Sequence, residues 1–394
     1  MEGKRILVYL SVMCYYMRTL SVVLFLSLIS LVSKGQLNVF RRPAPSIDSS
    51  DLEISKLFKQ KLYDKALSKL NSKINMSSAS GIDYFNRAVI KYYKFGENNE
   101  QGVDTSIFND CKRALRIGYD SPELHYVMFS LLQPNHALYG EDGSRQDITF
   151  EDAKKEIDIA IEKSTERPIK YRFARSLLCY WQFLFIGYEV SDEKTIRNLK
   201  YDCEFVVAST KNKDRLGVSN YILSQVSYKI EGDTIAAIRF LTDAITADTT
   251  KIQYVQERAR MKYEIGNYRG AIVDYNKYLA REKRPEDFII LGNCYTLINE
   301  KATALTTYSK SISLINEELQ LISKNKSKAN IKTFDDYAGD IRANRLKYKI
   351  GQAYFLRGLT YLDLNNKTKA CLDLNKAIDY GYKDAQETIT ESCQ

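Results

Sequence analysis

The sequence is poor in histidine, tryptophan and proline. Its 394 residues include two histidines, one tryptophan and six prolines. His125 and His136 lie 11 residues apart with no cysteine nearby, so we expect neither a histidine-rich metal site nor catalysis by several histidines. So few prolines, beside abundant Lys, Leu, Ala, Ile and Tyr, indicate long helices rather than many turns.

The residues that are present favour a large folded chain without catalytic chemistry. The sequence is 44% hydrophobic and 27% charged, which is too apolar for a disordered chain. It contains no G-x-S-x-G, no H-E-x-x-H, no glycine-rich phosphate loop and no D-x-D-x-D-G calcium loop. Acidic pairs such as Asp335 and Asp336 are typical of helix caps and solvated faces. We therefore predict that the protein is not an enzyme and needs neither cofactor nor metal.

The N-terminal residues have the pattern of a secretory signal peptide. Thirteen uncharged, mostly apolar residues run from Leu20 to Val32, with Arg18 in front of them. Ser33 and Gly35 supply the small residues that precede a cleavage site, which predicts cleavage after Gly35. The apolar stretch is short for a membrane span, which needs roughly 20 residues. We predict that residues 1–36 are a signal peptide and that the mature chain, without a membrane span, is secreted or lies in the periplasm or cell envelope.

Residues 1–16 leave alternatives open, because Ile6 to Tyr16 is a second apolar run. Translation starting at Met17 would give a signal peptide of ordinary length. Otherwise residues 1–32 form a long signal peptide or an uncleaved anchor, or this stretch is a buried core helix. Residues 37–50 include Arg41 to Ser46, a proline-containing run that predicts an extended linker.

The positive charge does not indicate nucleic-acid binding. The formal net charge is +9 and falls to about +6 when residues 1–36 are removed. The basic residues are spread along the chain, whereas nucleic-acid binding requires a clustered basic surface. We therefore expect no nucleic-acid partner.

A repeated spacing of small and aromatic residues organises the second half of the chain. In each copy a large apolar residue is followed by a small residue four positions later, and usually by Tyr at seven. An alanine opens the next helix at position sixteen, and in four copies it is Ala237, Ala271, Ala304 and Ala370. The steps between these alanines are 34, 33 and 66 residues, the last being two periods. Apolar residues spaced by three and four indicate amphipathic helices, which the regular breaks join into helix–turn–helix pairs.

This spacing resembles the tetratricopeptide repeat, whose pattern is W-x2-L-G-x2-Y, then A-x3-F-x2-A, then P. Gly358 with Ala370, and Gly292 with Ala304, supply the small residues at which the two helices of a pair approach closely. The chain departs from the pattern in three ways. Tyr, Val or Phe replaces Trp, the closing Pro is missing, and Arg258 and Arg357 stand where the family has Leu.

The resemblance implies an all-α, right-handed superhelix of about seven or eight helical pairs, of a degenerate type found in exported bacterial proteins. We expect it to occupy residues 51–394 and to end in a capping helix from Lys383 to Cys393. The repeats that fit best are 218–251, 252–284, 285–316 and 351–381.

The resemblance also implies a function, which is to hold a protein or peptide partner in a concave groove lined by the first helix of each pair. The groove positions of the family fall here on Lys229, Gln256, Arg260, Tyr263, Asn293 and Thr296. The Lys/Asn clamp that grips peptide C-termini in chaperone-binding relatives is absent. We predict a non-catalytic scaffold in the cell envelope; the alternative is a helical-repeat surface receptor for glycan or another small solute.

Six cysteines remain after cleavage, an even number that permits disulfides in an exported chain. Cys371 lies ten residues before, and Cys393 eleven residues after, a predicted turn centred near Gly381 and Tyr382, which would bring them level in an antiparallel helix pair. Cys179 and Cys203 flank a turn near residue 190 in the same way. For each pair the alternative is two free, packed thiols.

Overall fold

The computed structural model describes most of the chain after the predicted signal peptide. The described residues are 44–76, 78–97, 105–132, 137–139, 145–147, 149–165, 168–186, 193–325 and 334–393. The predicted signal peptide and residues 37–43 of the predicted linker lie outside them. The chain forms two compact units, one ending at Ile230 and the other beginning at Glu231.

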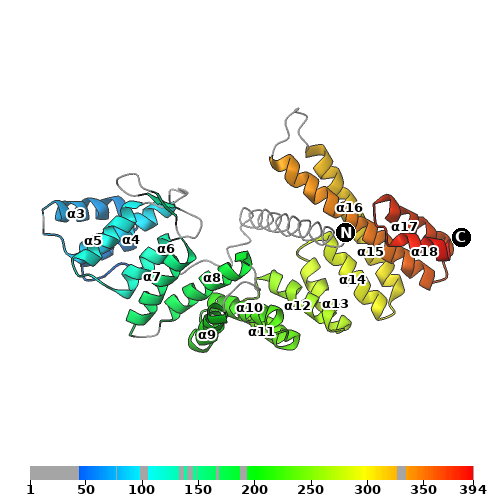
Figure 1. The fold of residues 1–394 in the computed structure, drawn as a ribbon, viewed down its shortest axis with the longest axis horizontal. Coiled ribbons are helices and arrows are strands. Elements are labelled where there is room, and N and C mark those ends of the chain that lie inside the picture. Colours follow the sequence, from blue (N-terminus) through cyan, green and yellow to red (C-terminus); the bar gives the residue numbers. More distant parts are fainter. Residues whose placement is uncertain are drawn as a thin grey trace, which may run out of the picture. The chain divides into compact units, whose positions relative to one another are not determined.

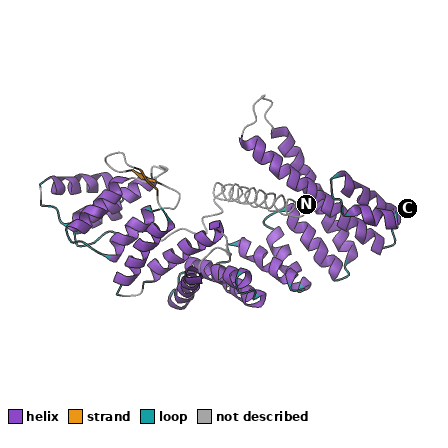
Figure 2. Cartoon of the chain, viewed as in Figure 1, coloured by secondary structure: helices purple, strands orange, loops and turns teal. Residues whose placement is uncertain are grey.

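Unit 1 consists of antiparallel helix pairs and one short strand ladder (Figures 1 and 2). Its helices are α2 (Leu52–Lys59), α3 (Tyr63–Asn75), α4 (Gly81–Glu97), α5 (Thr105–Arg116), α6 (Pro122–Leu131), α7 (Phe150–Lys163), α8 (Ile169–Ile186), α9 (Glu193–Ser209) and α10 (Lys213–Lys229). The ladder pairs β1 (Ala137–Tyr139) antiparallel to β2 (Arg145–Asp147) between α6 and α7. Helices adjacent in sequence pack as α2–α3, α4–α5, α6–α7 and α8–α9, and α10 packs on α9.

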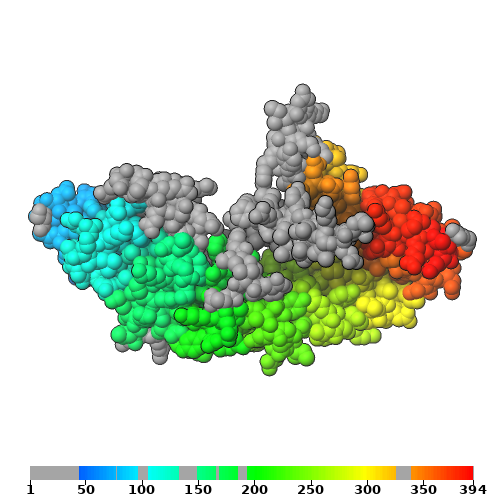
Figure 3. Space-filling model, viewed as in Figure 1, coloured from blue at the N-terminus to red at the C-terminus, as the bar shows by residue number. Residues whose placement is uncertain are grey.

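Unit 2 repeats the same plan and ends in a short helix. Its helices are α11 (Thr234–Ala247), α12 (Ile252–Glu264), α13 (Tyr268–Leu279), α14 (Pro285–Leu297), α15 (Lys301–Asn325), α16 (Phe334–Asp363), α17 (Lys367–Asp379) and α18 (Ala385–Ser392). The pairs are α12–α13, α14–α15 and α16–α17, and α18 packs on α17 in the place of the predicted capping helix. Figure 3 shows the surface of α17 and α18 in red, at the C-terminal end of this unit. The predicted all-α helical-repeat class is confirmed.

The turns between paired helices are made by residues with the required backbone preferences. Gly266 adopts a φ of 77°, in the left-handed region that glycine enters without a steric penalty. The side chain of Asn267 then caps α13 by accepting a hydrogen bond from the Gly270 amide. These two residues end one helix and begin the next within a single short turn.

The core follows the spacing of small and bulky residues. The four alanines that open the second helices, at positions 237, 271, 304 and 370, are all fully buried. At Gly292 the two helices of a pair approach closely, because a Cβ atom there would lie 2.4 Å from the ring of Tyr308. Gly292 therefore admits a large buried ring that any side chain would displace.

We expect Gly292→Ala to lower the free energy of unfolding by about 1–3 kcal/mol relative to Gly358→Ala. Both substitutions share the gain in helix propensity of about 1 kcal/mol. They differ in the atoms that the new Cβ would meet. At Gly358 the Cβ would lie 3.1 Å from Leu374, whereas at Gly292 it would lie 2.4 Å from the Tyr308 ring. Urea unfolding of the two variants measures the difference; equal losses would contradict the packing described at Tyr308.

Candidate functional site

The six residues predicted to line a groove lie on three first helices and fall in both units. Lys229 is the last residue of α10, in unit 1. Gln256, Arg260 and Tyr263 are on α12, and Asn293 and Thr296 are on α14. Five of the six therefore belong to unit 2, where their contacts can be compared directly.

On α12 the predicted residues form polar contacts near the surface. Gln256 Nε2 donates to Asp287 Oδ2 at 2.7 Å, which links α12 to the first turn of α14. Arg260 forms ion pairs with Glu257 at 2.9 Å and with Glu264 at 3.0 Å, both on its own helix. These side chains present a polar surface of mixed charge.

On α14 the predicted residues contact the interior. The Tyr308 hydroxyl donates to Asn293 Oδ1 at 2.6 Å and lies 3.2 Å from Thr296 Oγ1. Tyr308 is 1% exposed, so its hydroxyl needs partners inside the protein. Asn293 and Thr296 supply them, and this structural role was not expected from the sequence.

Asp287, the hydrogen-bond partner of Gln256, is a buried carboxylic acid at the start of α14. Burial raises its pKa from 3.8 to about 6, and the repulsion of Glu286 adds to this, against the opposing effects of Arg284 and of the hydrogen bond from Gln256. Because the folded chain binds this proton more tightly than the unfolded chain, the contribution of Asp287 to stability falls as the pH rises from about 4 to above 6.

We therefore expect Asp287→Asn to stabilise the chain by about 2 kcal/mol at pH 7 and to have little effect near pH 4. The asparagine can still accept the hydrogen bond from Gln256, and it no longer carries a buried charge. Urea unfolding of both proteins across this pH range measures the change. A loss of stability at pH 7, or a constant difference at all pH values, would contradict the origin given for the shift.

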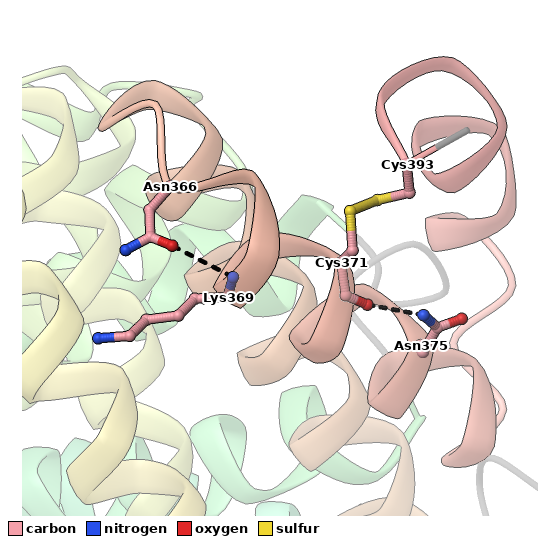
Figure 4. Close-up of a disulfide and its surroundings, with 5 residues drawn as sticks. All are labelled: Asn366, Lys369, Cys371, Asn375 and Cys393. Carbon is pink, nitrogen blue, oxygen red and sulfur yellow. Dashed lines mark hydrogen bonds between the residues drawn. A yellow bond between two sulfur atoms is a disulfide. The ribbon is translucent and has the colours of Figure 1, made fainter.

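The cysteines differ between the two predicted pairs. A disulfide joins Cys371 in α17 to Cys393 at the end of α18, with Cα atoms 5.7 Å apart, and so ties the terminal helix to its neighbour (Figure 4). Cys179 and Cys203 are not joined, contrary to the second suggestion from the sequence. Both are fully buried packing residues, and burial raises the pKa of the Cys179 thiol to about 12.

Arginine–aspartate pairs connect the two helices of several repeats. Each guanidinium donates from two nitrogens to both oxygens of one carboxylate, and the pairs are Arg87–Asp110, Arg175–Asp202, Arg258–Asp274 and Arg357–Asp373. In the pair α6–α7, His125 and Glu156 make the corresponding contact at 2.6 Å. The two arginines that depart from the repeat pattern therefore have a structural partner. A 16-residue spacing from Arg258 and from Arg357 to an aspartate was the sequence signal that could have revealed it.

In unit 1 an extended segment of the chain lies against the first helices of the repeats. This segment, residues 44–50, is called the strap below. The sequence predicts an extended linker over residues 37–50; in the described part, residues 44–48 have no helix or strand and are hydrogen-bonded to the repeats, and residues 49–50 form a turn before α2. Four side chains form its hydrogen-bonding surface, called the strap groove, and they are Asn86, Tyr93, Tyr119 and Glu123.

The backbone of the strap is held at three positions. Asn86 on α4 accepts from the Asp48 amide at 2.8 Å and donates to the Asp48 carbonyl at 3.1 Å. The Tyr93 hydroxyl donates to the Pro45 carbonyl at 2.7 Å, and Glu123 accepts from the Ser46 amide. These contacts are made with main-chain groups, as when an extended peptide is recognised.

Side chains of the strap also contact the repeats. Ser46 Oγ donates to Glu123 Oε1 at 2.9 Å, and the Tyr119 hydroxyl donates to Asp48 Oδ2 at 3.1 Å. Between them, Ile47 packs on two apolar core clusters of unit 1. The groove thus contacts a hydroxyl, an apolar side chain and a carboxylate in succession.

The electrostatics of the groove suit an acidic side chain next to Tyr119. Burial alone would raise the pKa of Asp48, but hydrogen bonds from Ser50 and Tyr119 outweigh it and lower the pKa below its ordinary value. Burial raises the pKa of Tyr119 to about 12, so its hydroxyl remains a donor at neutral pH. From α8, Lys170 and Tyr171 donate to the oxygens of Glu123 and fix its carboxylate.

The described residues offer few other functional features. No helix within the described ranges combines the length and the apolar character that a bilayer crossing requires. Nor does this part of the chain bring together three or more His, Cys, Asp or Glu side chains in a group that could hold a metal ion.

A comparison with protein-family models finds one match in the part of the chain that has the repeat pattern. Residues 351–380 match the family model described as tetratricopeptide repeat. No curated protein matches the chain. Among solved structures, the chain is similar to a tetratricopeptide repeat protein from Parabacteroides merdae ATCC 43184, at 14% identity over 79% of this chain and 99% of that chain, with a TM-score of 0.38.

Two other solved structures have comparable similarity. MamA is 20% identical over 42% of this chain and 97% of that chain, with a TM-score of 0.25. The TPR domain of P58(IPK) is 14% identical over 86% of this chain and 97% of that chain, with a TM-score of 0.24. From the matched repeat and the helix pairs around it, the chain is identified as a tetratricopeptide-like helical-repeat protein.

Proposed function

We propose that this protein is a non-catalytic, exported scaffold that binds a protein or peptide partner on the first helices of its repeats. Helical-repeat folds present long rows of exposed side chains and commonly serve such interactions. The observation that carries the proposal is the strap groove, where Asn86 binds both the amide and the carbonyl of one residue in an extended segment. A surface that already binds main-chain groups in this way suits recognition of an extended polypeptide.

Two observations support export. The run from Leu20 to Val32 fits the apolar core of a signal peptide. The Cys371–Cys393 disulfide suits an oxidising compartment such as the periplasm or the cell surface, because disulfides are rare in the cytosol. Together they favour a mature chain in the cell envelope or outside the cell.

Affinity capture tests the proposed scaffold. A tag placed after Gln394 leaves the N-terminal segment intact, and the mature chain is purified from envelope extracts under native conditions. We expect one protein to be recovered in a stoichiometric amount. Recovery of no protein, together with a shift of melting temperature by glycans, would reject the scaffold in favour of a glycan receptor.

The same preparation tests the proposed export. We expect the mature protein to be found outside the cytoplasm and its N-terminal sequence to begin at Gln36. A chain that stays in the cytoplasm with its N-terminus intact would contradict export, and it would leave the binding proposal standing.

A further inference from the structure

We infer that the strap groove is a recognition site for an extended peptide with a Ser-apolar-Asp core, and that this chain's own strap occupies it in place of a partner segment. The inference rests on the proposed function only for the partner, since the site itself is read from contacts within unit 1. The hydrogen bonds of Asn86, Tyr93, Tyr119 and Glu123 define the site.

The contacts of the strap have the pattern of a bound ligand. A segment that only connects two parts of a chain needs no side-chain partners for its backbone. Water can form hydrogen bonds with its exposed amide and carbonyl groups. Here successive main-chain groups of Pro45, Ser46 and Asp48 each find a side chain of the helical repeats. The helix residues involved are 38 to 77 positions away in sequence, so the site is assembled by the repeats and not by local turns.

The site has a clear chemical preference at each position. Glu123 is an acceptor for both the amide and the hydroxyl of Ser46, so it favours a residue that offers two donors. Ile47 enters an apolar environment that includes Phe58 and Tyr93. Tyr119 donates to the Asp48 carboxylate, so an acceptor is preferred there. A partner segment with serine, an apolar residue and aspartate in succession would meet the same three environments.

The strap can leave without unfolding the helices. It contacts the repeats through polar groups and through two apolar side chains, the buried Pro45 and the partly buried Ile47, whereas α4 is anchored by a longer row of buried side chains that includes Phe85, Ala88 and Val89. Segments with few buried apolar contacts open at a lower free energy than helices in the core. A tethered occupant competes at a high effective concentration, of the order of mM for a short linker. A partner with additional contacts would therefore be needed to displace it.

The test uses the full mature chain and a synthetic peptide. The strap-released variant is Ser46→Pro with Asp48→Pro, because proline retains an extended backbone and removes the two amide donors. The probe is a fluorescein-labelled peptide with the sequence of residues 44–50, Ala-Pro-Ser-Ile-Asp-Ser-Ser. We expect it to bind the released variant at least tenfold more tightly than the unsubstituted chain. Adding Asn86→Leu to the released variant should abolish binding.

Matched controls separate recognition from general effects. Ser49→Ala alters an exposed strap residue and should bind the probe like the unsubstituted chain. A probe with Asn in place of Asp and Ser in place of Ile should bind the released variant at least tenfold more weakly. Equal probe binding by the released and unsubstituted chains would overturn the inference. So would failure of a folded released variant, checked by circular dichroism, to bind the probe.

If the released variant does not fold, hydrogen exchange of the unsubstituted chain tests whether the strap opens without the helices of unit 1. We expect the amides of Ser46 and Asp48 to exchange at least tenfold faster than the core amides of α4. Equal protection would mean that the strap opens only with unit 1 and would overturn the inference. A concentration-dependent dimer dissolved by the probe would also overturn it, since a second copy would then be the occupant.

The two proposals can fail separately. Probe binding by the released variant without any captured protein would keep the recognition site and remove the scaffold function. Capture of a protein that is unchanged by Asn86→Leu would keep the scaffold and remove the recognition site.

Discussion

Replacing Asp373 with leucine is expected to lower the free energy of unfolding by about 3–5 kcal/mol, the cost of leaving one member of a buried ion pair without its partner. Asp373 accepts from Arg357 Nε at 2.7 Å and from Nη2 at 2.8 Å. The side chains of Arg357 and Asp373 are 17% and 6% exposed, so water cannot replace the lost contacts well. Chemical unfolding followed by circular dichroism measures the change.

The control for this prediction removes both charges. We expect Arg357→Leu with Asp373→Leu to be at least 2 kcal/mol more stable than Asp373→Leu alone, because no buried charge is left unpaired. The repeat of α14 and α15 has Leu291 and Thr307 at the corresponding positions and packs without an ion pair there. A double variant as unstable as the single one would contradict this account of the Arg–Asp pairs.

Loss of the C-terminal disulfide has the second large expected effect. We expect Cys371→Ser with Cys393→Ser to lower the free energy of unfolding by about 3 kcal/mol, because the bond restricts the unfolded chain. The bond closes a loop with a sequence separation of 22 residues and attaches the last helix to α17. Urea unfolding of the oxidised protein and of the double variant measures the change.

Reductant supplies the control. Dithiothreitol should reduce the stability of the unsubstituted chain to that of the double variant and should leave the double variant unchanged. Mass spectrometry without reductant should find Cys371 and Cys393 joined and the other cysteines free. Free thiols at both positions, or a double variant as stable as the oxidised chain, would contradict the disulfide.

The helical-repeat class could be predicted because its signals are local. Alanines at a step of 34 residues and apolar residues spaced by three and four specify helix pairs from the sequence alone. The Cys371–Cys393 pair could also be predicted, since two helices and one turn place the residues at nearly equal distances from that turn. Each of these inferences needs only the geometry of a single helix pair.

The strap groove could not be predicted, because its contacts join residues far apart in sequence. Asn86 binds Asp48 across 38 residues, and Glu123 binds Ser46 across 77. The sequence predicts an extended linker over residues 37–50, and it does not indicate what these residues contact. Nothing in the local pattern distinguishes a bound segment from a free linker.

The predicted groove residues illustrate a second limit. Asn293 and Thr296 were assigned from the repeat pattern to an exposed surface, and the structure gives them the hydroxyl of Tyr308 as a partner. The cause is Gly292, which lets the Tyr308 ring come close to α14. A family pattern fixes the positions in a repeat, whereas the size of a neighbouring side chain decides what each position contacts.

Calorimetric titration of the captured partner into the purified mature chain tests the central claim most directly. We expect a stoichiometry of one partner per chain and an affinity at least tenfold weaker for Asn86→Leu than for the unsubstituted chain. Asn276→Leu, on an exposed position of α13, serves as the matched control and should bind normally. Equal affinity of Asn86→Leu and the unsubstituted chain would contradict the claim that this protein holds its partner on the first helices of unit 1.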